Sequence, residues 1–125
     1  METVFGLINV ATLPWWLSML LFPSSRATLR MVTSPWPFVV LAAAYLALLL
    51  SAIFTGPAPA SLDAAALASA FASPWGFLAA WMHMLALDLF AGVWIFRDAR
   101  FYGRVPRLEL LATWWTGPIG LGVYL

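Results

Sequence analysis

The sequence predicts an all-α integral membrane protein, in which four transmembrane helices form a bundle and a short amphipathic helix lies between the second and third spans. Three observations support this fold class. Of the 125 residues, 64% are hydrophobic and only 9% are charged, with a mean hydropathy of +0.93, whereas a soluble domain carries roughly a quarter charged residues. Pro, Gly and Arg separate four apolar segments. All six basic residues are arginines, and they cluster in two loops.

Each apolar segment is long enough to cross a bilayer. A hydrocarbon core of about 30 Å takes about 20 helical residues, and a helix satisfies its own backbone hydrogen bonds where water is absent. The first segment lacks the basic start and the cleavage site of a signal peptide, so we expect it to be retained in a single membrane domain covering residues 1–125. The four predicted spans are residues 4–22, 37–54, 74–96 and 108–125.

The arginines predict the orientation of the spans. Arg26 and Arg30 lie between the first and second spans, and the loop between the second and third spans carries only Asp63 as a charged residue. The other four lie between the third and fourth spans: Arg97, Arg100, Arg104 and Arg107. By the positive-inside rule both arginine-rich loops are expected in the cytoplasm and both termini on the opposite, non-cytoplasmic side.

The segment RDARFYGRVPRLE, after the third span, is dense in charge. Arg97 with Asp98, and Arg107 with Glu109, are expected to form interfacial pairs whose long side chains reach the lipid headgroups. The alternative is a gate of fixed charges at the mouth of a pocket.

A short amphipathic helix is predicted over residues 61–72. Ser61 is suited to be its N-cap, and Asp63 in the first turn favours the positive end of a helix. Apolar residues then recur at helical spacing, which is typical of a helix lying in the membrane interface. A partly ordered Ala-rich loop is the alternative.

Two ionisable residues, His83 and Asp88, stand inside the third apolar segment. Such groups are costly in a membrane and usually face the bundle interior. A separation of five helical residues amounts to about 140° of rotation and about 7.5 Å of rise, so the two side chains are expected on different faces. If the two residues serve only in helix packing, the His83 imidazole would donate to a helix carbonyl, and the Asp88 carboxylate would accept from polar groups of neighbouring spans. The groups available are Asn9, Thr12, Ser18, Thr113 and Thr116.

The eight tryptophans fall into two groups. Four lie near predicted span ends, as in an aromatic belt: Trp15, Trp16, Trp36 and Trp75. The others belong to the third and fourth spans and are candidates for packing against a flat apolar ligand, with ordinary helix packing as the alternative: Trp81, Trp94, Trp114 and Trp115.

The fourth span contains TGPIGLGVYL, a segment that weakens a helix. Pro118 removes the backbone hydrogen bond to the carbonyl of residue 114. Broken membrane helices are tolerated where neighbouring groups satisfy the backbone. A break beside Gly117 therefore indicates either a ligand site or a place where helices pack closely.

Several functions are excluded or disfavoured by what the sequence lacks. One histidine and no cysteine exclude a conventional zinc or iron–sulfur site. A net charge of +1 without a basic stripe excludes a nucleic-acid-binding surface. Neither a phosphate-binding loop nor a nucleophile elbow is found, and no ring of charges or filter motif indicates an ion channel.

Two separated motifs in the C-terminal half resemble the abscisic acid-deficient 4-like family of small four-span membrane proteins. The likeness is close in the third and fourth spans, and rests on hydropathy and Pro and Trp placement in the first two. One departure is Val93, which stands before Trp94 where the family commonly has arginine. The matching residues are Trp81, His83, Leu85, Ala86, Asp88, Leu89, Phe90 and Gly92, then Asp98, Pro106, Gly117, Pro118, Gly120 and Leu121.

The resemblance implies a carotenoid or similar polyene as ligand, because plant members are linked to the formation of neoxanthin from violaxanthin, an epoxide-to-allene rearrangement. An isomerase of this kind would use Asp88 to abstract or deliver a proton, and His83 to protonate or hydrogen-bond the ring oxygen. The expected location is a bacterial inner membrane or a photosynthetic membrane. The expected ligand-binding residues are Trp81, Trp94, Trp114, Trp115, Thr113, Thr116 and Gly117.

A non-catalytic role stays open beside the enzyme. The chain is also suited to be an accessory transmembrane subunit of a larger assembly, such as a photosynthetic pigment–protein complex. In that case His83 would ligate the magnesium of a chlorophyll or bacteriochlorophyll. A scaffold or assembly factor without any ligand is a third alternative.

Overall fold

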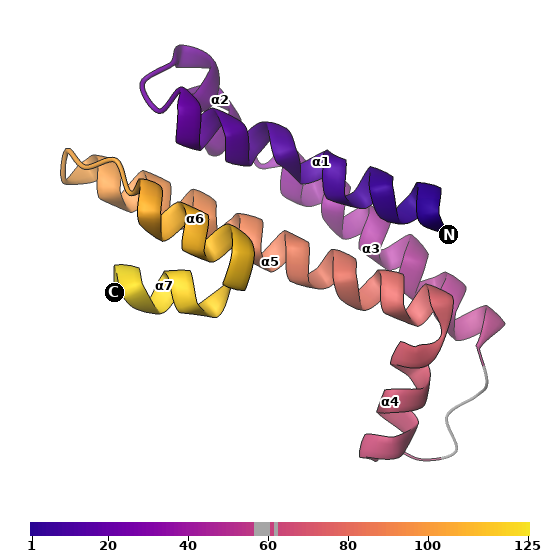
Figure 1. Cartoon of the computed structure of the whole chain (residues 1–125). Coiled ribbons are helices and arrows are strands. Elements are labelled where there is room, and N and C mark those ends of the chain that lie inside the picture. The colour runs from indigo at the N-terminus through magenta and orange to yellow at the C-terminus, as the bar shows by residue number, and fades with distance from the viewer. Residues whose placement is uncertain (57–60, 62) are drawn as a thin grey trace.

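The computed structural model describes residues 1–56, 61 and 63–125, and in this part of the chain every regular element is a helix (Figure 1). Three of the helices are long and apolar enough to cross a membrane, namely α1, α3 and α5, which is consistent with an integral membrane protein. The all-α prediction is confirmed, whereas the four-span count is not. The helices are α1 (Glu2–Leu21), α2 (Arg26–Thr33), α3 (Trp36–Thr55), α4 (Ala64–Ala72), α5 (Pro74–Phe101), α6 (Arg107–Thr116) and α7 (Pro118–Tyr124).

The central element is α5, against which α1 packs in the same direction. Phe5 of α1 stacks on Phe77 near the start of α5, with ring centroids 6.2 Å apart. Further along both helices, the Trp16 ring lies on Gly92, where an added Cβ would come within 2.5 Å of the indole. Gly92 therefore permits the close approach of a neighbouring helix that such small residues provide in membranes.

The helix α3 packs on another side of α5 and runs in the opposite direction (Figure 1). Phe38, near its start, meets Phe90, while Tyr45, further along, meets His83. Most of the α3 surface is exposed apolar side chain, and only Pro37, Leu41 and Leu48 are buried. Such a surface suits contact with lipid, because lipid tails are as apolar as the side chains themselves.

The fourth predicted span, residues 108–125, is not one helix but a hairpin formed by α6 and α7. Gly117 joins them with φ +53°, a conformation that glycine adopts at little cost. Pro118 then begins α7, since proline fits the first turn of a helix but not its interior. The two helices are 10 and 7 residues long, so neither spans about 30 Å.

The hairpin changes where the chain ends. Gly117 lies beside Asp88, near the middle of α5, and Tyr124 reaches Asp98, ten residues further along α5. The helix α7 therefore returns toward the arginine-rich end of the bundle. The two termini lie at opposite ends of the long helices, so this arrangement does not bring them to one end as expected (Figure 1). The cytoplasmic location of the arginine-rich end stays a prediction.

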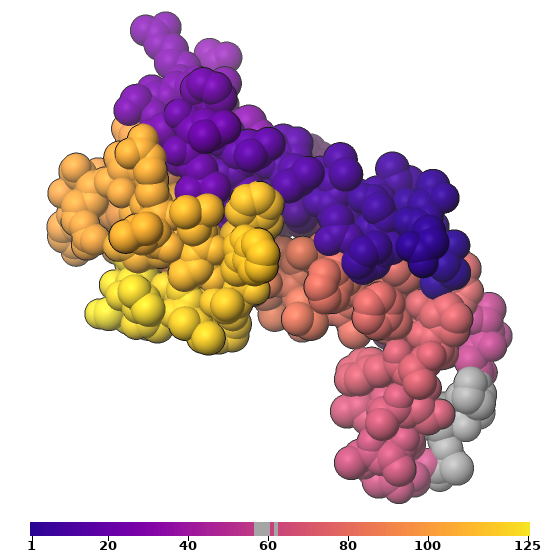
Figure 2. All heavy atoms as spheres, viewed as in Figure 1, coloured from indigo at the N-terminus to yellow at the C-terminus, as the bar shows by residue number. Residues whose placement is uncertain are grey.

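Two short helices flank the long ones. The loop after α1 contains α2, which was not predicted, and the Ser25 hydroxyl caps it by accepting from the Ala27 amide at 3.2 Å. The helix α4 lies within the predicted range 61–72, of which residue 62 is outside the described residues. It projects from the body of the protein (Figure 2), and its position relative to the membrane interface stays a prediction.

The cap of α4 differs from the prediction. Asp63, rather than Ser61, is the N-cap: its carboxylate accepts from the Ala66 amide at 2.8 Å, and Ser61 donates to it at 2.7 Å. The hydrogen bond from the Ala66 backbone, followed by that from Ser61, lowers the pKa of Asp63. Both bonds favour the charged carboxylate over the neutral acid.

Candidate functional site

An open groove of about 1160 Å³ lies between α3, α4 and α5. Pockets for drug-sized ligands usually measure about 300–1,000 Å³, so the groove suits a long ligand. Its walls are mainly apolar, with Leu49, Ile53, Phe77 and Met84 among them. A groove of this kind favours an elongated hydrocarbon over a polar metabolite.

His83 and Tyr45 place two polar rings on the α5 and α3 walls of this groove. Their ring centroids are 5.4 Å apart and their planes are inclined by 46°. The His83 side chain is exposed rather than packed into the core. An imidazole and a phenol are both able to donate a hydrogen bond, so together they form a polar point on an apolar wall.

Trp81 lines the same groove as His83. Its indole N–H donates to the Asn9 side-chain oxygen at 3.2 Å, which ties α5 to α1. Its ring also stacks on Phe77, with centroids 6.1 Å apart and planes inclined by 19°. Trp81 therefore holds two helices together and forms part of the groove wall.

Asp88 lies on a different face of α5 from His83, as the helical spacing predicts. Its half-buried carboxylate lies against Gly117 at the tip of the α6–α7 hairpin, and it does not line the α3–α4–α5 groove. Within the described residues, no group donates a hydrogen bond to this carboxylate; the expected donors bond to backbone carbonyls instead. These are Asn9, Thr12, Ser18, Thr113 and Thr116.

The other predicted ligand-binding residues do not gather in one site. Trp94 meets the Tyr124 ring edge to face, with centroids 5.8 Å apart. Trp114 stacks on the buried Trp16 at 6.0 Å and thus takes part in core packing, while Trp115 is 83% exposed. Thr113 is fully buried against Gly120, whereas Thr116 is exposed.

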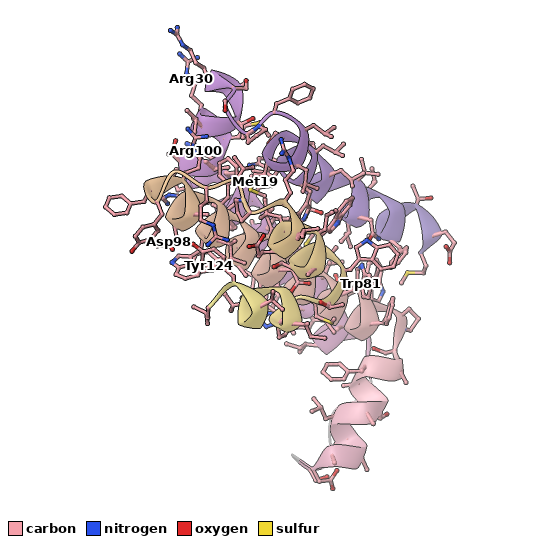
Figure 3. All side chains as sticks on the ribbon, turned by 60° about the vertical axis from the view of Figure 1, so that its left-hand side comes forward. Met19, Arg30, Trp81, Asp98, Arg100 and Tyr124 are labelled. Atoms are coloured by element: carbon pink, nitrogen blue, oxygen red, sulfur yellow. The ribbon has the colours of Figure 1, made fainter. Side chains whose placement is uncertain are left out.

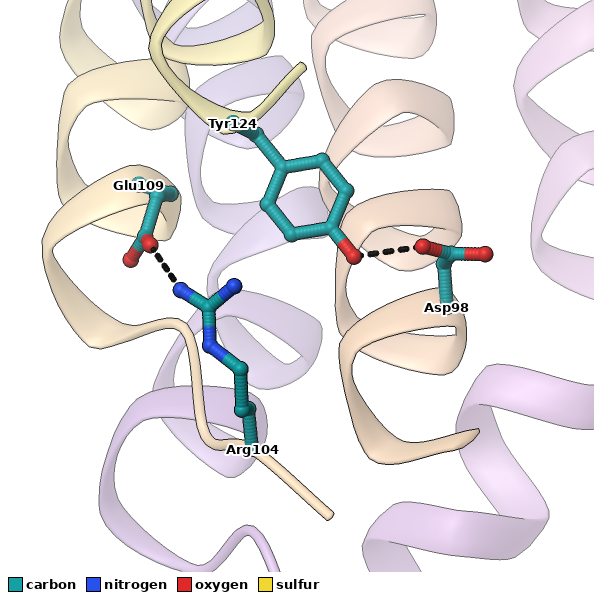
Figure 4. A network of polar contacts seen from close by, with 4 residues as sticks. All are labelled: Asp98, Arg104, Glu109 and Tyr124. Carbon is teal, nitrogen blue, oxygen red and sulfur yellow. Dashed lines mark hydrogen bonds and ion pairs between the residues drawn. The ribbon is translucent and has the colours of Figure 1, made fainter. Parts of the chain in front are cut away.

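The polar pairs at the arginine-rich end differ from those expected (Figure 4). Glu109 pairs with Arg104 at 3.0 Å rather than with Arg107. Asp98 accepts from the Tyr124 hydroxyl at 2.5 Å rather than pairing with Arg97. Figure 3 places Asp98 and Tyr124 together, away from Trp81. The hydrogen bond between Tyr124 and Asp98 holds the hairpin against α5, because it joins the end of α7 to the last turns of α5.

Tyr45 is the residue of the groove that the sequence analysis missed. The signal was present: Tyr45 and Ser51 carry the only side-chain hydroxyls in the charge-free segment 37–54, and Tyr45 is its only phenol. A single phenol in such a segment needs a polar neighbour or a ligand, as buried tyrosine hydroxyls generally do.

The family described as ABA DEFICIENT 4-like matches residues 3–124, nearly the whole chain. The protein belongs to this family. No curated protein and no solved structure matches the chain. The resemblance inferred from the third and fourth spans is thus confirmed, and for this ABA DEFICIENT 4-like protein the match also includes the first two spans.

Proposed function

We propose that this ABA DEFICIENT 4-like protein binds a carotenoid or a similar polyene in the groove between α3, α4 and α5. The observation that carries the proposal is a long apolar groove with the Tyr45 and His83 rings on its walls. The conjugated chain would lie along the apolar walls. An oxygen on the end ring would accept a hydrogen bond from the imidazole or the phenol.

The catalytic form of the proposal is an isomerisation of that bound end group. Opening an epoxide to an allene requires a proton for the epoxide oxygen as the C–O bond breaks, and loss of a proton from carbon as the new C=C bond forms. His83 is suited to give the first proton, since a positioned imidazole is a common general acid. The role assigned to Asp88 stays a prediction, because its carboxylate lies on another face of α5.

Binding is tested by adding violaxanthin, which carries epoxide end groups, or β-carotene, which carries no oxygen, to the purified protein. Bound pigment is measured from its absorption spectrum after gel filtration. The proposal is supported if the wild type binds both pigments but prefers violaxanthin, and if Tyr45→Phe and His83→Ala lose that preference. The matched control is Tyr102→Phe, since this exposed side chain is not among the groove residues. No binding of either pigment by the wild type contradicts the proposed binding, and equal binding of both pigments by the wild type and the variants contradicts the proposed hydrogen bond from Tyr45 or His83.

Catalysis has a separate test in the product. The carotenoids extracted after incubation with the wild type, His83→Ala and Asp88→Asn are identified by chromatography. Formation of an allene by the wild type and its loss in His83→Ala support an isomerase. Conversion that survives both substitutions contradicts the assigned roles.

The exposed imidazole of His83 favours a second candidate, a pigment-binding accessory subunit. An accessible neutral imidazole is able to ligate the magnesium of a chlorophyll or bacteriochlorophyll. The protein is purified from its native membranes, and its pigments and partners are identified by absorption and mass spectrometry. A chlorin that is present in wild type and absent from His83→Ala supports this candidate, whereas a carotenoid alone supports the first.

A further inference from the structure

A second groove lies at the arginine-rich end of the bundle, between the α2–α3 corner and the last turns of α5. Its volume is about 580 Å³. Phe38 and Phe90 meet in it edge to face, with ring centroids 5.7 Å apart, and Trp94 continues this aromatic wall. Arg97 and Ser34 also line the groove. The same cavity therefore joins an apolar wall to a guanidinium group and a hydroxyl group.

Three of the other arginines at this end are engaged by the protein itself. Arg100 donates to the Pro23 carbonyl in the turn after α1 at 2.8 Å, and Arg107 donates to the Leu20 carbonyl at the end of α1 at 3.2 Å. Arg104 forms an ion pair with Glu109. Arg97 is exposed and makes no hydrogen bond or ion pair within the described part of the chain. Its five N–H donors are thus available to a ligand.

The carboxylate next to Arg97 does not form an ion pair with it. Asp98 also borders the groove, but its carboxylate accepts from the Tyr124 hydroxyl of α7. Among the described residues, the only ion pair joins Arg104 to Glu109. The guanidinium of Arg97 therefore presents an unpaired positive charge to whatever occupies the groove.

The depth of Arg97 in a bilayer indicates what kind of molecule occupies the groove. With residues 87 and 88, the middle of α5, at the bilayer centre, Arg97 lies roughly 14 Å from that centre along the helix. Half of the hydrocarbon core measures about 15 Å. Arg97 would thus meet the phosphate level of the lipids, while Phe90, seven residues earlier, would lie roughly 10 Å deeper, beside the acyl chains.

We propose that this groove is a binding site for an anionic phospholipid. The guanidinium of Arg97 holds the phosphate, for which its planar fork of donors is suited, and the Ser34 hydroxyl, which also lines the groove, is a second donor. The first acyl segments lie on the wall formed by Phe38, Phe90 and Trp94. An anionic headgroup is favoured over a zwitterionic one because this end of the bundle carries six arginines and only two carboxylates, Asp98 and Glu109, so arginines are in excess at the headgroup level.

The test is native mass spectrometry of the purified full chain, titrated with phosphatidylglycerol or with phosphatidylcholine of the same acyl chains. The wild type is expected to retain phosphatidylglycerol more strongly. Arg97→Gln should weaken that binding about fivefold, the effect of one basic residue at an anionic surface. The affinity of Arg97→Lys for phosphatidylglycerol should lie between those of the wild type and Arg97→Gln, since lysine keeps the charge but loses the bidentate contact.

The matched control is Arg26→Gln, an exposed arginine of α2 that is not among the groove residues. It should bind phosphatidylglycerol as the wild type does. A wild-type affinity in Arg97→Gln overturns the proposal, and so does an equal loss in Arg26→Gln, because attraction would then belong to the whole basic end. Circular dichroism of each variant verifies that the helices are intact.

Discussion

Gly92→Ala tests the close packing of α1 on α5, and two effects of opposite sign compete in it. Alanine is favoured over glycine inside a helix by about 1 kcal/mol. The new Cβ, however, would lie 2.5 and 2.7 Å from two ring atoms of Trp16, where ordinary contact begins near 3.4 Å. The overlap is thus about 1 Å against a rigid ring that is 1% exposed.

Overpacking of this kind costs about 1–3 kcal/mol, and Trp16 has little room to yield because Trp114 stacks on its ring at 6.0 Å. We therefore expect a net loss of about 1–2 kcal/mol in the free energy of unfolding. The assay is unfolding in mixed micelles of increasing sodium dodecyl sulfate content, followed by far-ultraviolet circular dichroism. This signal does not depend on tryptophan fluorescence.

Gly6→Ala is the matched control, because Gly6 is also inside a helix and its Cβ would meet no atom within 4 Å. It should leave stability unchanged or raise it by up to about 1 kcal/mol. The double variant Gly92→Ala with Trp16→Leu should lose less unfolding free energy than the sum of the losses in the two single variants, because the smaller side chain relieves the overlap. Gain of stability in Gly92→Ala, or full additivity in the double variant, would refute the packing argument.

Three further predictions concern the hairpin and α4. Gly117→Ala should cost at least about 1–2 kcal/mol, since an L-residue is strained at positive φ and the Cβ would also overlap the Asp88 carboxylate; faster hydrogen exchange in α7 is the readout. Tyr124→Phe removes the bond to Asp98 and should cost about 0.5–2 kcal/mol, whereas the exposed Tyr102→Phe should change little in the same assay. Asp63→Ala should speed exchange in α4. The lowered pKa of Asp63 means that its cap is intact above the unfolded value of about 3.9 and is lost as the pH falls through the folded value. Unchanged exchange in α7 or α4, or equal stability of the two Tyr variants, would contradict these expectations.

Much of the helix pattern could be predicted because hydropathy depends on composition and not on tertiary contacts. The segments 37–54 and 74–96 correspond to α3 and α5, and α5 extends five residues further, through charged residues that remain helical. The separation of His83 from Asp88 also followed from local geometry, since helical rotation alone turns residues five apart to different faces. Which neighbour each residue would meet was not accessible in this way.

The α6–α7 reversal escaped prediction for a physical reason. Hydropathy is the same whether an apolar segment crosses the membrane or turns back at Gly117, because the sign of φ at one glycine leaves composition unchanged. The polar partners escaped for a related reason. Local spacing favoured Arg97 with Asp98, yet the returning helix brings the Tyr124 hydroxyl to that carboxylate, and the turn before α6 brings Arg104 rather than Arg107 to Glu109.

The amino-acid sequence was sufficient for the family, the helical class and the apolar character of the chain, because each depends on residue types at fixed spacing. Tertiary structure alone decided the course of the last helix, the pairing of Tyr45 with His83, and the contact of Asp88 with Gly117. These depend on how rigid helices pack on one another, and a few small residues control that packing. Gly92 leaves room for the Trp16 ring, and Gly117 adopts the positive φ that reverses the chain. The lack of a side chain at these two positions therefore sets how α1 and α7 pack on α5.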